Sequence, residues 1–227
     1  MPEVVRNIEE IRMDGRLACA RISWDGSANY IPGQYALGSA LDSDELLPSV
    51  LFPVAWEEDG MLVPIPAKVN WTLGTQLKLH APLGIGFALP VSARRIALVD
   101  PVGSAERLLS LLDTPQAREG SVVVLRTQTD LDLPEMVEAL PMDELGEIVE
   151  WADFIAVDLS RSTPEAFQTG LGIDHNNTKR TAIQALMRLP MVCGLNVECG
   201  LCSVKTQRGW KLGCKDGPVF DWWDLED

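Results

Sequence analysis

The sequence predicts an α+β protein of three consecutive parts: an N-terminal antiparallel β-barrel, an α/β domain with a parallel sheet, and a C-terminal cysteine loop. Residues 1–94 hold short apolar runs separated by turn residues, which is typical of small barrels and sandwiches. Residues 95–190 alternate predicted strands with predicted helices, the pattern of a parallel sheet. Residues 191–227 contain four of the five cysteines.

The N-terminal part is predicted from its alternating apolar residues and from the turn pairs between them. Asp14-Gly15, Pro32-Gly33 and Asp59-Gly60 mark turns, because aspartate, proline and glycine favour turn conformations. The expected strands are Val4-Val5, Leu17–Ile22, Gln34–Leu37, Val50–Trp56, Met61–Ile65 and Leu77–His80.

The second part is predicted from three buried-type strands, Ile96–Val99, Val122–Leu125 and Phe154–Val157. Helical spacing of apolar residues appears between and after them, with Ser104, Thr163 and Asn177 as candidate N-caps. The expected helices are Ser104–Leu112, Pro134–Glu150 with a break at Pro141, Pro164–Thr169 and Thr178–Leu189.

Charge and hydropathy exclude several classes of protein. The 227 residues carry 33 acidic against 19 basic side chains, a net charge of −14, which disfavours nucleic acid as a partner. No apolar run approaches the roughly 20 residues that a membrane span needs. The first residues lack the basic and apolar regions of a signal peptide, so we expect a cytoplasmic protein without membrane contact.

The C-terminal cysteines have the spacing C-x5-C-x2-C-x11-C, at Cys193, Cys199, Cys202 and Cys214. A structural zinc site and a bare Cys-x2-Cys redox pair are both compatible with a close pair. A [2Fe–2S] cluster accounts best for all four cysteines, although the first gap is one residue longer than in plant-type ferredoxins. Cys19 lies in an alternating strand pattern and is predicted to be a core residue.

Three further motifs accompany the cysteines in a recognisable order. They are Pro32-Gly33-Gln34-Tyr35, Pro82-Leu83-Gly84-Ile85-Gly86-Phe87 and Cys214-Lys215-Asp216-Gly217-Pro218-Val219-Phe220. Together with the cysteine spacing they resemble the electron-transfer subunit family of dihydroorotate dehydrogenase, within the ferredoxin reductase-like superfamily. The motifs extend over the whole chain, and the last of them is the most specific.

The resemblance implies a [2Fe–2S] cluster on Cys193, Cys199, Cys202 and Cys214. It also implies an FAD on residues 1–94, a nicotinamide site on residues 95–190 and a cluster domain at residues 191–227. The family would exchange electrons with a flavin-containing dehydrogenase subunit, in a hetero-oligomer that serves pyrimidine synthesis.

The flavin motifs of the family are degraded in this sequence. The family's Arg-Pro-x-Ser motif, which supplies a charged donor to the FAD pyrophosphate, is best matched by Leu47-Pro48-Ser49, without the arginine. Its Gly-x-Gly-Thr loop at a helix N-terminus is matched by Gly74-Thr75, either as a remnant or because the loop and helix are deleted. Ser49, Gly74 and Thr75 are therefore candidate flavin contacts, and FAD binding is doubtful.

The nicotinamide motifs are also degraded. The glycine-rich turn after the first strand is reduced to Asp100-Pro101-Val102-Gly103, in which an aspartate would repel phosphate. The family's Cys-Gly-Pro is replaced by Val157-Asp158-Leu159. We therefore do not expect NAD(P) to bind.

The sequence leaves three functions open and contains no catalytic triad, paired-carboxylate site or P-loop, so we predict no catalytic residue. The first is an iron–sulfur electron-transfer subunit that passes single electrons to or from a flavin-containing partner. The second is a structural or regulatory metal-binding paralogue without redox turnover. The third, a complete FAD- and NAD(P)H-dependent reductase, is what family analogy alone would predict.

Overall fold

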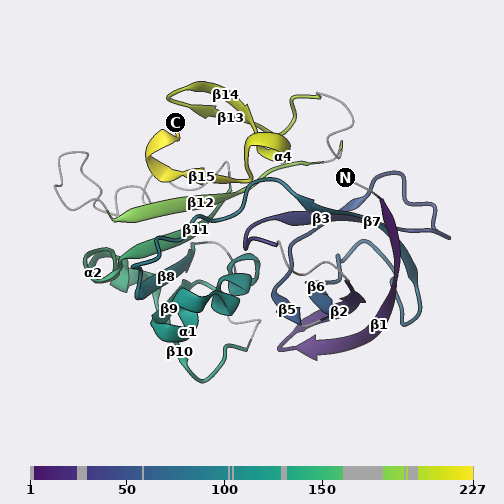
Figure 1. Cartoon of the computed structure of the whole chain (residues 1–227), viewed down its shortest axis with the longest axis horizontal. Coiled ribbons are helices and arrows are strands. Elements are labelled where there is room, and N and C mark those ends of the chain that lie inside the picture. The colour runs from purple at the N-terminus through teal and green to yellow at the C-terminus, as the bar shows by residue number, and fades with distance from the viewer. Residues whose placement is uncertain are drawn as a thin grey trace.

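The computed structural model describes residues 3–24, 30–57, 59–101, 103, 105–128, 132–160, 181–191, 193 and 199–226. It contains a seven-stranded sheet, a six-stranded sheet and a two-stranded hairpin. The two large sheets lie side by side, and the hairpin stands at one end of the molecule (Figure 1). Within the described ranges, no helix is both long and apolar enough to cross a membrane.

The seven-stranded sheet confirms that the N-terminal part is antiparallel and rich in strands. Its order is β4-β3-β7-β1-β2-β6-β5, with β4 and β5 at the edges. Strand β7 shows the alternation that predicts it, because Leu77 and Leu79 point into a core with Ile8 and Ile22 while Lys78 stays exposed. The bounds are β1 (Val4–Asp14), β2 (Leu17–Ser23), β3 (Tyr35–Ala40), β4 (Ser49–Leu51), β5 (Ala55–Glu57), β6 (Gly60–Pro64) and β7 (Gln76–Leu83).

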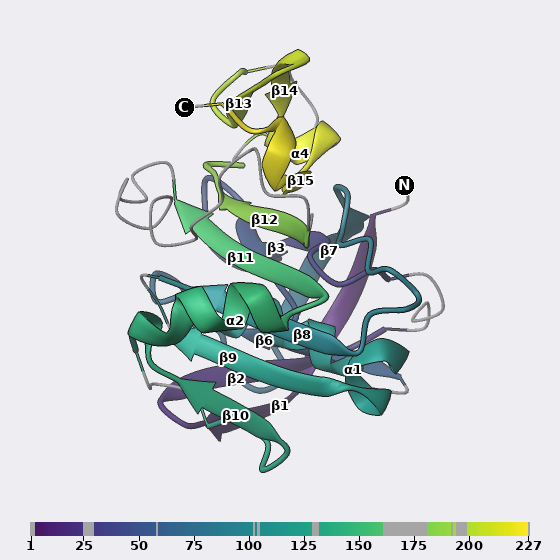
Figure 2. The ribbon, with the colours of Figure 1, turned by 90° about the vertical axis from the view of Figure 1, so that its left-hand side faces the viewer.

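The six-stranded sheet has the order β10-β9-β8-β11-β12-β15, in which all pairs but the last are parallel. Helix α2 packs on one face through Leu145 and Ile148 (Figure 2). The 3-10 helix η2 packs on the other face through Leu108 and Leu111. The strands are β8 (Arg95–Asp100), β9 (Ser121–Arg126), β10 (Val137–Leu140), β11 (Phe154–Ser160), β12 (Ala182–Arg188) and β15 (Val219–Asp221). The helices are η2 (Glu106–Asp113), α1 (Pro115–Glu119), η3 (Met142–Glu144) and α2 (Leu145–Trp151).

One helix prediction in this part was wrong, and another was right only for its second half, after Pro141. The expected helix Thr178–Leu189 is strand β12, which pairs with β11 on one side and β15 on the other. Its residues are good helix formers, but two strand partners and a buried sheet position override local propensity. The expected helix Pro134–Glu150 forms β10 before Pro141, and helical structure starts only at Met142. The predicted helix Pro164–Thr169 and the candidate caps Ser104, Thr163 and Asn177 lie outside the described residues.

Three glycine-containing turns join the two large sheets. Gly84 has a φ of 75°, and a Cβ there would lie 2.6 Å from the Gly217 oxygen and 2.7 Å from Pro218 Cδ. Gly33, with a φ of 89°, would place a Cβ 2.7 Å from Val219 Cγ2. Ile85 forms a bridge with Pro218, so the segment after β7 is tied to the C-terminal segment. Close packing and a left-handed φ therefore favour glycine at both positions.

We expect Gly84→Ala to lower the free energy of unfolding by about 3 kcal/mol, since the variant combines a left-handed φ with a backbone clash. Gly74→Ala is the matched control, because Gly74 has a φ of 81° but no atom within 4 Å of its ideal Cβ. It should cost about 1 kcal/mol. Urea denaturation followed by circular dichroism measures both, and equal losses would show that the junction tolerates a methyl group.

Candidate metal centre

The four clustered cysteines lie around the base of a hairpin formed by β13 (Ser203–Thr206) and β14 (Gly209–Leu212). Cys202 directly precedes β13, and Cys214 lies in the short helix α4 (Gly213–Asp216) that follows β14. The Gly213 amide donates a 2.9 Å hydrogen bond to the Cys202 carbonyl, which closes the base of the hairpin. The hairpin therefore brings together two cysteines that are twelve positions apart in the chain.

Three of the four cysteines pack in an apolar cluster against the N-terminal sheet. Cys202 and Cys214 are 1% and 3% exposed and cluster with Leu37, Leu83 and Met191. Cys193 packs on this cluster and is half-buried, whereas Cys199 is exposed. None of the five cysteines forms a disulfide; all five are among the described residues. The structure thus places Cys193, Cys202 and Cys214 in one apolar pocket and Cys199 at the surface.

The electrostatics of the site show that three thiols influence one another. Burial, together with the neighbouring Cys202 and Cys193, raises the pKa of the Cys214 thiol to about 12. Thiolates gathered in an apolar pocket repel one another unless a cation offsets their charge. A bound metal reverses this effect, since a coordinating thiol is deprotonated outright. The soft, sulfur-only donor set fits an iron–sulfur cluster or zinc.

An iron–sulfur cluster and a zinc ion make different demands on the arrangement of four cysteines. Among the described residues, no group of three histidine, cysteine, aspartate or glutamate side chains is arranged so as to hold one metal ion. A two-iron cluster shares its four cysteines between two metal positions, so it requires a wider arrangement than a single tetrahedral ion. Residues 194–198, which link Cys193 to Cys199, lie outside the described part of the chain.

Sequence reasoning missed Tyr35 as a neighbour of the cysteine site. Its hydroxyl donates a 3.1 Å hydrogen bond to the Cys214 carbonyl, and the side chain is 1% exposed. Burial raises the pKa of this phenol, so it remains a donor. The two residues are 179 positions apart in the chain, and no local pattern links them. Tyr35 orients the Cys214 segment from the N-terminal sheet, as hydrogen-bonded groups behind metal ligands do.

The candidate flavin residues are not brought together. Ser49 is the register partner of Gly38, which in turn pairs with Leu79 on β7. Thr75 precedes Leu79 by four residues, or about 13 Å of extended strand. Gly74 and Thr75 form a turn that leads directly into β7, and residues 65–84, all described, contain no helix. The phosphate-binding helix N-terminus of the family is therefore absent from this stretch.

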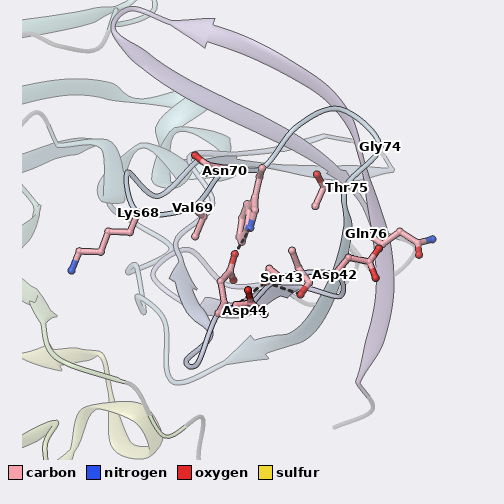
Figure 3. A pocket seen from close by; sticks show the side chains of 12 residues that line it. Asp42, Ser43, Asp44, Lys68, Val69, Asn70, Gly74, Thr75 and Gln76 are labelled. Atoms are coloured by element: carbon pink, nitrogen blue, oxygen red, sulfur yellow. Dashed lines mark hydrogen bonds between the residues drawn. The ribbon is translucent and has the colours of Figure 1, made fainter.

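Gly74 and Thr75 do line a cavity of about 620 Å³. Asp42, Asp44 and Glu45 also line this cavity, and the Glu45 carboxylate accepts a 3.1 Å hydrogen bond from Trp71 Nε1 (Figure 3). The Lys68 side chain points away from Thr75. Ser49 is not among the described residues that line the cavity. The carboxylates would repel a pyrophosphate, so the cavity does not have the chemistry of an FAD phosphate site.

A buried ion network occupies the carboxyl ends of the parallel strands. Arg188 Nη2 lies 2.7 Å from the Asp100 carboxylate and 2.9 Å from that of Asp158. Arg107 Nη1 lies 2.8 Å from Asp158, and its guanidinium stacks 4.2 Å from the centre of the Phe52 ring. Both aspartate side chains are completely buried. In open α/β sheets this edge, where the strand order reverses between β8 and β11, is where ligands bind.

The network includes the two aspartates that stand at the positions of the expected nicotinamide motifs. A Cβ on Gly103 would collide with the Asp100 carboxylate and lie 2.9 Å from Arg188, so this glycine packs on an ion pair. Asp100 also accepts a 3.1 Å hydrogen bond from the Ala105 amide. Sequence reasoning noted both aspartates but missed their arginine partners. The available signal was a charged residue at the end of each buried strand.

Comparison with known proteins links the cysteine site to a family. A model described as the iron–sulfur cluster binding domain of dihydroorotate dehydrogenase B matches residues 190–226. The sulfhydrogenase 1 subunit gamma of Pyrococcus furiosus is 51% identical over 35 residues, which are 15% of this chain and 12% of that protein. The match thus spans a small part of that curated relative.

Solved structures resemble the chain over most of its length. A structure of an NADH-dependent reduced ferredoxin–NADP oxidoreductase has a TM-score of 0.75 and 15% identity, covering 98% of this chain and 90% of that chain. A phthalate dioxygenase reductase has a TM-score of 0.58 and 11% identity, covering 90% and 87%. A ferredoxin NADP+ reductase from Neisseria gonorrhoeae has a TM-score of 0.57 and 14% identity, covering 82% and 98%. At these identities the likeness shows the fold.

Proposed function

We propose that the chain is an iron–sulfur electron-transfer subunit, because residues 190–226 match the cluster-binding domain model of dihydroorotate dehydrogenase B and the fold is similar to that of ferredoxin reductases. Cys193, Cys199, Cys202 and Cys214 would hold a [2Fe–2S] cluster. The cluster would supply one-electron chemistry when bound. The partner would be a flavin-containing dehydrogenase subunit in a hetero-oligomer.

The observation that carries the proposal is the division of the cysteines between an apolar pocket and the surface. Cys202 and Cys214 are held by Leu37, Leu83 and the Tyr35 hydrogen bond, which exclude water from one side of the site. Cys199 and Gly200 are exposed on the other side. A site buried on one side and open on the other suits electron exchange across an interface.

The same geometry argues against a complete reductase. Arg107, Arg188 and the two buried aspartates occupy the crevice that a pyridine nucleotide would need. The turn at Gly74 and Thr75 offers no helix N-terminus to FAD phosphates. We therefore propose that electrons enter and leave through the cysteine site alone, with both nucleotide sites lost.

Metal, sulfide and flavin analysis of anaerobically purified protein tests this function. We expect two irons and two acid-labile sulfides per chain, as a [2Fe–2S] cluster requires. Flavin should be absent, and NADH should not bleach the visible bands. Zinc without iron would instead support the structural or regulatory paralogue. Stoichiometric flavin together with bleaching by NADH would support the complete reductase.

A further inference from the structure

We propose that Phe52 and Arg107 are positioning residues for the metal centre. Arg107 fixes the Phe52 ring, Phe52 packs on Tyr35, and the Tyr35 hydroxyl holds the Cys214 segment. This inference rests on the electron-transfer function proposed above and names residues outside the cysteine loop that set its geometry. It connects the cysteine site with the buried ion network at the edge of the parallel sheet.

The first contact of this series is the hydrogen bond from Tyr35 to Cys214. The phenol is 1% exposed, and its hydroxyl lies 3.1 Å from the Cys214 carbonyl oxygen. The ring has little free space, because a Cβ on Gly84 would lie only 3.0 Å from Tyr35 Cε1. The position of the ring therefore determines whether the hydroxyl meets the Cys214 carbonyl.

Phe52 connects Tyr35 to the second part of the chain. The centres of the two rings are 6.0 Å apart, and their planes are tilted by 39°. Aromatic pairs at this separation attract one another beyond the effect of burial alone. Phe52 packs both on the cluster that contains Cys214 and on the core that contains Leu108. A shift of the Phe52 ring would therefore be felt by Tyr35.

Arg107 holds the other side of this connection. Its guanidinium carbon lies 4.2 Å from the centre of the Phe52 ring. The guanidinium is itself fixed by β11 and β12, since Nη1 lies 2.8 Å from Asp158 and Nη2 donates a 3.2 Å hydrogen bond to the Met187 carbonyl. A planar guanidinium can pair with a carboxylate and stack on a ring at once, which a lysine ammonium does less well. The ion network thereby fixes the Phe52 ring.

The consequence for the cysteine site follows from the Cys214 carbonyl. Groups that hydrogen-bond behind a metal ligand fix its orientation, and hydrogen bonding around a cluster is one of the factors that set its reduction potential. Cys214 shares its apolar pocket with Cys202 and Cys193, so a displacement of its segment changes the spacing of all three sulfur atoms. Loss of the phenol hydroxyl, or of the contacts that hold the ring, should loosen the site.

Tyr35→Phe in the purified, iron-loaded full chain tests the hydroxyl. We expect several-fold faster release of iron to a chelator than in wild type. The midpoint potential should shift to more negative values, because a donor that offsets the negative end of a carbonyl dipole is lost. Tyr30→Phe is the matched control, since the other of the two tyrosines donates a 3.0 Å hydrogen bond to the Gln34 carbonyl. It should leave both quantities unchanged.

Phe52→Leu and Arg107→Lys test the positioning role. Each should speed iron release several-fold and shift the potential in the same direction as Tyr35→Phe. If they act through the phenol hydroxyl, their effects are not additive with its loss. In the Tyr35→Phe background we therefore expect each to change the release rate less than twofold. Effects that are equal with and without the hydroxyl, or a Tyr35→Phe variant with wild-type release and potential, overturn the inference.

Backbone hydrogen exchange separates this inference from the proposed function. Exchange at residues 213–216 can be followed by mass spectrometry whatever metal the chain contains. We expect Tyr35→Phe and Phe52→Leu to speed it several-fold and Tyr30→Phe to leave it unchanged. A chain without iron and sulfide that shows these differences fails the function and supports the positioning role. A chain with iron and sulfide that shows no differences fails this inference alone.

Discussion

Arg107→Leu is expected to lower the free energy of unfolding by about 3–5 kcal/mol, the usual cost of removing one partner from a buried ion pair. The substitution leaves the Asp158 carboxylate buried with one of its two arginine partners gone. It also removes a 3.2 Å hydrogen bond to the Met187 carbonyl and the stacking on Phe52. Urea denaturation followed by circular dichroism measures the change.

The loss of unfolding free energy in Arg107→Leu should depend on pH. Burial raises the pKa of Asp158 to about 6 in wild type, although Arg107 and Arg188 act in the opposite direction. Removing Arg107 lets that pKa rise further. A carboxyl whose pKa is higher folded than unfolded stabilises the fold at low pH, and that contribution is lost as pH rises through the folded pKa. The deficit relative to wild type should therefore be larger at pH 8 than at pH 5.

Two further variants show whether burial of the ion pair causes the loss of stability in Arg107→Leu. Arg118→Leu removes an exposed arginine 3.6 Å from Asp113 and should cost less than about 1 kcal/mol. The double variant Arg107→Leu/Asp158→Leu should recover much of the lost stability, since it removes the unpaired buried charge. An Arg107→Leu deficit as small as that of Arg118→Leu at pH 8 would mean that the ion network is not sealed from water.

The strands could be predicted where buried residues follow a short repeat in the local sequence. In β7 and β11 the sequence pattern and the burial pattern coincide, because β7 buries one face along its length and β11 is buried on both faces. Ala182–Arg188 could not be assigned in the same way. Its residues suit a helix, and its strand state depends on β11 and on β15, which follows it by more than 30 residues.

The candidate site could also be predicted only in part. The four cysteines are predicted to be ligands from their spacing, since the hairpin between Cys202 and Cys214 is a local structure. The contact between Tyr35 and Cys214 and the ion pair between Arg107 and Asp158 could not be predicted, because each joins residues that are far apart in the chain. The loss of nucleotide motifs is readable in sequence, but the ion network that occupies the crevice is visible only once β8, β11 and β12 lie side by side.

Cys202→Ser is expected to give a colourless protein that contains less than one iron per chain. Serine cannot replace a thiolate on iron without loss of affinity, because soft sulfur ligands select iron–sulfur centres. The variant should also be destabilised by several kcal/mol, since binding free energy at such a site contributes directly to folding. Visible absorption, iron analysis and thermal unfolding under anaerobic conditions measure the three effects.

Two further serine variants separate ligation from packing. Cys19→Ser makes the same change at a completely buried position in β2 and should keep its iron and colour, because Cys19 lies in the N-terminal sheet away from the site. Cys199→Ser changes an exposed residue, so loss of packing is small. If Cys199 is a ligand, that variant loses colour as Cys202→Ser does. Full colour in Cys199→Ser would remove it from the ligand set and require a fourth ligand from another residue.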